Sequence, residues 1–119
     1  MPHSLRSYVI ALFALFYATP STAATMVASW YGRDFEGKTM ADGRAFRADD
    51  PTIAAHRTLP LGTELTLTNP RNGRSVTVRV QDRGPYIRGR SLDVSRAAAV
   101  ALGFARQGTA VLTVQTLSH

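Results

Sequence analysis

Carboxylate and imidazole side chains are the groups of this sequence that could do chemistry. The chain contains eight aspartate and glutamate residues, three histidines and no cysteine. The lack of cysteine excludes a thiol nucleophile, a zinc–thiolate site and a disulfide framework. No serine stands in a nucleophile-elbow pattern, and His56, the histidine away from both ends, has no spaced partners for a metal site. General acid/base chemistry by carboxylates and an imidazole is what remains.

Asp82 has the setting that best suits such chemistry. It follows the alternating segment 75–80 and precedes Arg83, Gly84 and Pro85. A carboxylate at the end of a strand, beside a glycine that lets a substrate approach the backbone, suits an acid/base site. The alternative is structural, with Asp82 capping the turn or pairing with Arg83.

Asp93 and His56 are the other two candidates. Asp93 stands between Leu92 and Val94, so a half-buried strand would direct its side chain away from theirs. It could act in catalysis, cap the helix that follows or pair with an arginine. His56 stands beside two alanines, where a hydrogen-bonded structural histidine is the more common outcome. Convergence with Asp82 in space would favour a catalytic role for His56 instead.

Aromatic residues near these candidates suggest a surface for sugars. Trp30 and Tyr31 are adjacent, and Tyr86 belongs to the same loop as Asp82. Aromatic rings stack on sugar rings through their apolar faces, although they more often fill cores. We expect Trp30 in the core and Tyr86 exposed.

Positive charge is in excess over the whole chain. The formal net charge is +6 and the isoelectric point is near 10.8, which fits a polyanionic partner without choosing one. Arg83, Arg88 and Arg90 cluster around the loop of Asp82, where they could hold substrate carboxylates. The alternative is a solvated basic surface.

Short alternating or apolar segments predict the strands that position these residues. The predicted strands are 26–31, 52–59, 63–68, 75–80 and 109–117, with a short strand-like piece at 92–94. Asn72 and Gly73 form a strong hairpin signal, so the third and fourth segments should pair in an antiparallel way.

One helix is predicted among these strands. Ser95 is a candidate N-cap for a helix over 96–102, and Gly103 stands where a C-terminal glycine belongs. The 119 residues suit one small domain. One short helix among five or six strands predicts a mainly β protein built as a small closed barrel.

The first 24 residues have the layout of a secretory signal peptide. One arginine precedes an unbroken apolar run over 8–17, and a proline and small residues follow it. The run is shorter than the roughly 20 residues that span a bilayer, which argues against a membrane anchor. We expect cleavage after Ala23 or Ala24 and one domain over 25–119.

Seven ordered segments resemble the core domain of the rare lipoprotein A (RlpA) family. They are 28–32 (ASWYG), 41–46 (ADGRAF), 54–63 (AAHRTLPLGT), 68–69 with 72–75 (TN, NGRS), 82–86 with 89–90 (DRGPY, GR), 92–95 with 97–99 (LDVS, AAA), and 102–103 (LG). The resemblance covers about residues 27–117.

The resemblance implies a six-stranded double-psi β-barrel with one or two short helices, similar to barwin and to the expansin N-terminal domain. It also implies a lytic transglycosylase, which cleaves the bond between N-acetylmuramic acid and N-acetylglucosamine without water and leaves a 1,6-anhydro end. One group protonates the leaving oxygen, and a base takes the proton of the C6 hydroxyl as it closes on C1. A single carboxylate that starts protonated can do both.

The resemblance also assigns the site. Asp82 falls on the family's active-site aspartate, His56 on its histidine, and Asp93 on an aspartate that the wider barrel group uses for catalysis or glycan contact. Asp82 would be the acid/base, His56 would orient or polarise, and Asp93 would assist. The expected substrate-binding residues are Arg44, Trp30, Tyr31, Arg83, Tyr86 and Arg90.

Arg44 departs from the family pattern, which commonly has an acidic residue at that place. The segment 46–56 is also one residue longer than usual and carries Asp49 and Asp50. An arginine favours ionised neighbouring carboxylates and makes them poorer acids. It therefore favours a second interpretation, a module that binds cell-wall glycan without cutting it. A nucleic-acid binder rests on charge alone and is not expected.

We expect a periplasmic or secreted protein, because typical family members carry a lipidated cysteine and this chain has none. The expected partner is the glycan of peptidoglycan, with no stable membrane anchor and no separate glycan-binding repeat. A monomer without cofactor or metal is expected.

Overall fold

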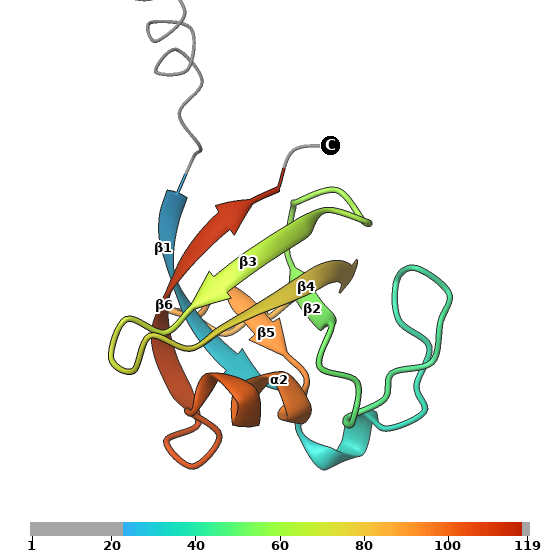
Figure 1. Cartoon of the computed structure of the whole chain (residues 1–119). Coiled ribbons are helices and arrows are strands. Elements are labelled where there is room, and N and C mark those ends of the chain that lie inside the picture. Colours follow the sequence, from blue (N-terminus) through green and yellow to red (C-terminus); the bar gives the residue numbers. More distant parts are fainter. Residues whose placement is uncertain (1–22, 118–119) are drawn as a thin grey trace, which may run out of the picture.

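The computed structural model describes residues 23–117, which form a closed barrel of six strands (Figure 1). The strands are β1 (Ala23–Trp30), β2 (Ile53–His56), β3 (Glu64–Thr68), β4 (Ser75–Asp82), β5 (Leu92–Val94) and β6 (Thr109–Thr116). Their order around the barrel is β1-β5-β2-β4-β3-β6. The pairs β1–β5 and β2–β4 are parallel and the other four are antiparallel. The predicted mainly β closed barrel is confirmed, and so is the antiparallel β3–β4 hairpin.

Two short helices accompany the strands, the 3-10 helix η1 (Arg33–Phe35) and the α-helix α2 (Arg96–Leu102). The helix α2 begins and ends where its capping residues predict. The Ser95 hydroxyl accepts a hydrogen bond from the Ala98 backbone N–H at 3.1 Å, and Gly103 ends the helix with φ of 80°. No helix among residues 23–117 is long and apolar enough to cross a membrane.

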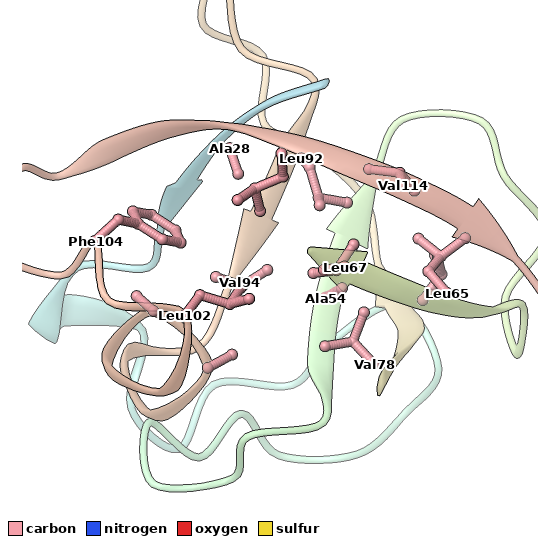
Figure 2. Packing of buried hydrophobic residues seen from close by; sticks show 14 residues of the cluster. Ala28, Ala54, Leu65, Leu67, Val78, Leu92, Val94, Leu102, Phe104 and Val114 are labelled. Carbon is pink, nitrogen blue, oxygen red and sulfur yellow. The ribbon is translucent and has the colours of Figure 1, made fainter. Parts of the chain in front are cut away.

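The barrel interior is filled by every second residue of the strands, because alternate side chains of a strand point to opposite faces. Leu65 and Leu67 of β3 and Val78 and Val80 of β4 are fully buried there. Leu102 and Phe104, at and beyond the end of α2, close one end of this cluster, as Figure 2 shows. The core therefore leaves the intervening residues of each strand facing outward.

A second buried cluster lies on the outer face of β2. The segment between β1 and β2 folds back so that Met40 and Phe46 cover Ile53 and Ala55. The ring of Tyr31 stacks on the ring of Phe46 with centroids 4.2 Å apart. This cluster fixes the long loop against the barrel, and it was not predicted from the sequence.

A β-bulge changes the direction of the end of β4. Ala54 pairs with Val80, but the next residue, Ala55, pairs with Asp82, so Gln81 is the extra residue. Without the bulge, Asp82 would share the inward face of Val80, two positions earlier. The bulge places Asp82 on the outward face with Ala55.

The predicted leader over 1–24 lies almost entirely outside the described residues. Only Ala23 and Ala24 are described, and they pair with Gln115 and Val114 of β6. The cleavage site stays a prediction.

Candidate active site

Two carboxylates meet on the outer face of the barrel because four neighbouring strands bring their residues into one row. Asp82 of β4 pairs with Ala55 of β2, Ala55 pairs with Asp93 of β5, and Asp93 pairs with Ser29 of β1. Paired residues of adjacent strands direct their side chains to the same face. Asp82 and Asp93 thus flank Ala55, whose buried methyl group lies at the base of the space between them.

The row forms the floor of a cleft of about 380 Å³. Its walls are Trp30, Tyr31, Gly32, Phe35, Arg83, Gly84, Pro85, Tyr86, Ile87 and Arg90. Both predicted aspartates and five of the six predicted substrate-binding residues therefore line one cleft.

Asp82 is held by two hydrogen-bond donors. The Tyr31 hydroxyl donates to Oδ2 and the Ala41 backbone N–H donates to Oδ1, each at 2.9 Å. Burial, followed by the negative charge of Asp82, raises the pKa of Tyr31, so its hydroxyl keeps its proton. Two donors on two oxygens suit an ionised carboxylate, which only accepts hydrogen bonds.

Asp93 has the properties of an acid near neutral pH. Its pKa is raised from 3.8 to about 6, chiefly by burial; the Ser29 hydrogen bond and the charge of Arg90 act in the opposite direction, and the charge of Asp82 makes a smaller upward contribution. The Ser29 hydroxyl donates to Oδ1 of Asp93 at 3.2 Å. A carboxyl group with this pKa is partly protonated at pH 6 to 7 and can give a proton to a substrate.

His56 does not line the cleft. It pairs with Leu92, whose side chain faces the barrel interior, so register places His56 on the opposite face from Asp93. Its Nδ1 accepts hydrogen bonds from the backbone N–H groups of Thr58 and Leu59 at 3.1 and 3.0 Å. Burial, then the charges of Arg57 and Arg83, lower its pKa. Within residues 23–117 no hydrogen bond joins His56 to Asp82. His56 fixes the turn after β2, and its expected orienting or polarising role stays a prediction.

The predicted arginines have different tasks. Arg83 lines the cleft, but its Nη1 donates to the carbonyl oxygens of His56 and Leu59 at 3.1 and 2.6 Å, which fastens the loop after β4 to the turn after β2. Arg90 is the cation that acts on Asp93. Arg44 does not line the cleft, because it lies in a separate hollow together with Arg47 and Arg79.

The predicted aromatic residues also differ. Trp30 was expected in the core, but it is only half-buried: it packs against the core, lines the cleft, and its Nε1–H donates to the Ala105 carbonyl at 3.0 Å. Tyr31 is only 5% exposed, so its ring cannot stack on a sugar and its hydroxyl is what reaches the cleft. Tyr86 is 74% exposed, as predicted.

Sequence reasoning missed Ser29 and Phe35. Phe35 is 46% exposed at the cleft and its ring meets Tyr31 edge to face. Phe35 could have been predicted as a cleft residue, because it is an aromatic residue in the polar, glycine-rich stretch after β1. Ser29 could be found only from the parallel pairing of β1 with β5, which no local pattern reveals.

Comparison with known proteins points to one family. The family model described as lytic transglycolase matches residues 23–114. A probable endolytic peptidoglycan transglycosylase RlpA from Aquifex aeolicus is 54% identical over 81 residues, which cover 68% of this chain and 35% of that protein. The endolytic peptidoglycan transglycosylase RlpA of Pseudomonas aeruginosa is 49% identical over 88 residues, covering 74% of this chain and 26% of that protein. The chain thus spans about a quarter to a third of the length of these relatives.

Solved structures share the barrel. An expansin from Clavibacter michiganensis has a TM-score of 0.63 and 26% identity, covering 82% of this chain and 51% of that one. A mutant of a Clavibacter michiganensis expansin was crystallised in complex with cellohexaose. A Streptomyces papain inhibitor has the same TM-score with 22% identity, covering 83% of this chain and 98% of that one, which shows the fold alone.

Proposed function

Because this chain belongs to the lytic transglycolase family and has its RlpA-like double-psi β-barrel, we propose that it is a lytic transglycosylase of peptidoglycan. The observation that carries the proposal is the pair of carboxylates in one cleft, Asp93 with a pKa raised to about 6 and Asp82 held by two donors. The relatives are named as endolytic peptidoglycan transglycosylases, which supports peptidoglycan as the substrate.

Asp93 supplies the acid in this proposal. Its carboxylic acid gives its proton to the oxygen that links N-acetylmuramic acid to N-acetylglucosamine. The bond from that oxygen to C1 of the muramic sugar breaks, and its electron pair stays on the leaving oxygen. Burial suits Asp93 to this step because it keeps a fraction of the group protonated near neutral pH.

Asp82 supplies the base. The C6 hydroxyl oxygen of the muramic sugar forms a new bond to C1, and its proton passes to the Asp82 carboxylate. The product carries a 1,6-anhydro ring and no water is consumed. Asp82 then loses its proton and Asp93 regains one from solvent. This division differs from the sequence-based expectation, in which Asp82 was the acid/base and Asp93 assisted, because burial acts on Asp93.

Sugar rings would lie against the exposed aromatic faces at the cleft, Phe35 and Tyr86. Phe35 ends the helix η1 and Tyr86 belongs to the loop after β4, and both line the cleft together with the two aspartates. An expansin that contains a barrel of this fold was crystallised with cellohexaose, and this chain matches 51% of that protein, which is consistent with a glycan ligand.

The test is digestion of purified peptidoglycan, followed by mass spectrometry of the fragments. We expect 1,6-anhydro-muramic ends from the unaltered protein and none from Asp93→Asn or Asp82→Asn. Asp49→Asn is the matched control, because Asp49 is an exposed carboxylate that does not line the cleft. Cleavage that persists in both cleft variants would refute the assignment.

A glycan-binding module without catalysis is the second candidate, which the departure at Arg44 suggested from the sequence. Arg44 lies outside the cleft, and the charged groups that act on Asp93 are Arg90 and Asp82. The same digestion separates the two candidates, since a binding module would sediment with peptidoglycan and release no fragments.

We also propose that residues 1–24 direct export to the periplasm or medium, where peptidoglycan is accessible. Its arginine, its apolar run and the small residues that follow support this proposal. Cell fractionation and N-terminal sequencing of the recovered protein test it. Protein retained in the cytoplasm at full length would contradict it.

A further inference from the structure

A second hollow, of about 410 Å³, adjoins the cleft on the side of β6. It shares Ser29, Trp30, Gly32 and Arg90 with the cleft, and the rest of its wall is the segment 105–109, which leads from α2 into β6. We call this space the side hollow. Because four residues border both spaces, the side hollow continues the cleft.

The row of residues on the floor of the cleft runs on into the side hollow. Asp93 of β5 pairs with Ser29 of β1, and Ser29 pairs in turn with Thr109 of β6, which lines the side hollow. Paired residues of adjacent strands direct their side chains to the same face. Neighbouring strands lie about 4.8 Å apart, so Thr109 is about 10 Å from Asp93 across the sheet. The side hollow therefore lies along the same outer face as the two aspartates.

The junction between the two spaces is open at Gly32. Its φ of −73° and ψ of 172° are values that any residue adopts, and a Cβ atom on Gly32 would meet no atom within 4 Å. Trp30 also borders the junction, and the Ala105 carbonyl holds its Nε1–H at 3.0 Å. The indole ring is thus fixed where the cleft meets the side hollow, which suits contact with a sugar ring.

The segment 105–109 presents hydrogen-bond donors to the side hollow. Its backbone is fixed, because Gly108 N–H donates to the carbonyl of the buried Phe104 at 3.0 Å. Arg106 and Gln107 are exposed, and within residues 23–117 their side chains form no hydrogen bond or ion pair. None of the described residues that line the side hollow is acidic. Guanidinium and amide N–H groups suit a ligand rich in oxygen acceptors, such as sugar hydroxyls and acetamide carbonyls.

We propose that the side hollow is a second sugar-binding subsite, which holds the part of the glycan strand that continues beyond the cleaved bond. The inference rests on the proposed function. A pyranose ring spans about 5 Å between its two linking oxygens, given bond lengths of about 1.5 Å. About two sugars therefore cover the roughly 10 Å from Asp93 to Thr109. A strand that reaches the side hollow binds more tightly than one that ends in the cleft.

The test measures the Kd of glycan oligosaccharides of increasing length by isothermal titration calorimetry. The ligands are peptide-free strands of two, four, six and eight sugars, and Asp93→Asn is the background, so that no strand is cleaved. The variants are Arg106→Ala and Gln107→Ala, of which the second keeps the net charge. Arg71→Ala is the matched control, because Arg71 is an exposed arginine that lines neither the cleft nor the side hollow.

We expect the Kd of the background to fall as the strand lengthens. Arg106→Ala should bind the eight-sugar strand about tenfold more weakly and Gln107→Ala about fivefold, while both bind the two-sugar strand as the background does. Arg71→Ala should match the background at every length. A loss that Arg71→Ala shares, an equal loss at every length, or no loss in either variant overturns the proposal. Because binding is measured without cleavage, the absence of anhydro products from the unaltered protein would refute the proposed function alone.

Discussion

Replacing Asp93 by asparagine should remove activity and stabilise the protein in a pH-dependent way. The pKa of Asp93 is raised from 3.8 to about 6 by burial. A raised pKa means that the folded state binds the proton more tightly than the unfolded state. The contribution of Asp93 to stability is therefore present below pH 3.8 and is lost as pH rises through 6.

The size of this loss follows from the shift. About two pKa units at roughly 1.4 kcal/mol each give about 3 kcal/mol at full ionisation. Between pH 4 and pH 7.5 the change is smaller, about 2 kcal/mol, because the unfolded chain already ionises near pH 4. Asparagine has nearly the same shape, still accepts from Ser29 and carries no charge, so it avoids this cost.

Urea unfolding of the unaltered protein and the Asp93→Asn variant at both pH values measures the effect. The quantity compared is the free energy of unfolding of Asp93→Asn minus that of the unaltered protein. We expect this difference to be about 2 kcal/mol larger at pH 7.5 than at pH 4. Asp49→Asn should show no such dependence, because Asp49 is exposed. A difference that stays constant with pH would refute the buried-acid argument.

Three further substitutions separate catalysis from structure. Tyr31→Phe removes the hydroxyl that donates to Asp82 but keeps the stacking on Phe46, so kcat should fall about tenfold or more with little loss of stability. An unchanged kcat would show that Tyr31 does not position Asp82 for catalysis. His56→Ala should lower the free energy of unfolding by about 1 kcal/mol in urea titrations, because two backbone donors lose their acceptor. The pH optimum of activity should not move, and a shifted optimum would indicate that His56 takes part in catalysis. Tyr86→Ala should raise KM for glycan with unfolding unchanged, since this side chain is 74% exposed, whereas an unaltered KM would exclude Tyr86 as a sugar platform.

Local sequence signals predicted the elements well because each depends on neighbouring residues. The helix with its Ser95 cap and Gly103 end is confirmed, as are the β3–β4 hairpin and the short strand that carries Asp93. Alternation of apolar residues also identified the inward face of the strands. These features follow from backbone preferences and burial of single strands.

The geometry of the site could not be predicted from such signals, because it depends on pairing between distant strands. Asp82 reaches the outer face because of the bulge at Gln81. Regular alternation of side chains along β4 beyond Val80 would have directed Asp82 into the barrel instead. Asp93 is partly buried, and it accepts a hydrogen bond from Ser29, 64 positions earlier, because β5 lies parallel to β1. The division of roles between the two aspartates follows from this burial.

The long loop between β1 and β2 shows the same limit. Met40 and Phe46 read as scattered apolar residues in a turn-rich stretch, yet they form a second core that fixes Tyr31 behind Asp82. Arg44 belongs to this loop, and its hairpin-like path carries the guanidinium away from the cleft. The geometry therefore gives no reason to expect that Arg44 makes Asp93 a poorer acid.

The measurement that tests the central claim most directly is mass spectrometry of peptidoglycan fragments produced in ¹⁸O-labelled water. The account predicts 1,6-anhydro-muramic ends without ¹⁸O, because the C6 hydroxyl of the sugar and not water attacks C1. These products should be absent with Asp93→Asn and with Asp82→Asn. Reducing ends that carry ¹⁸O, or binding to peptidoglycan without any cleavage, would contradict it.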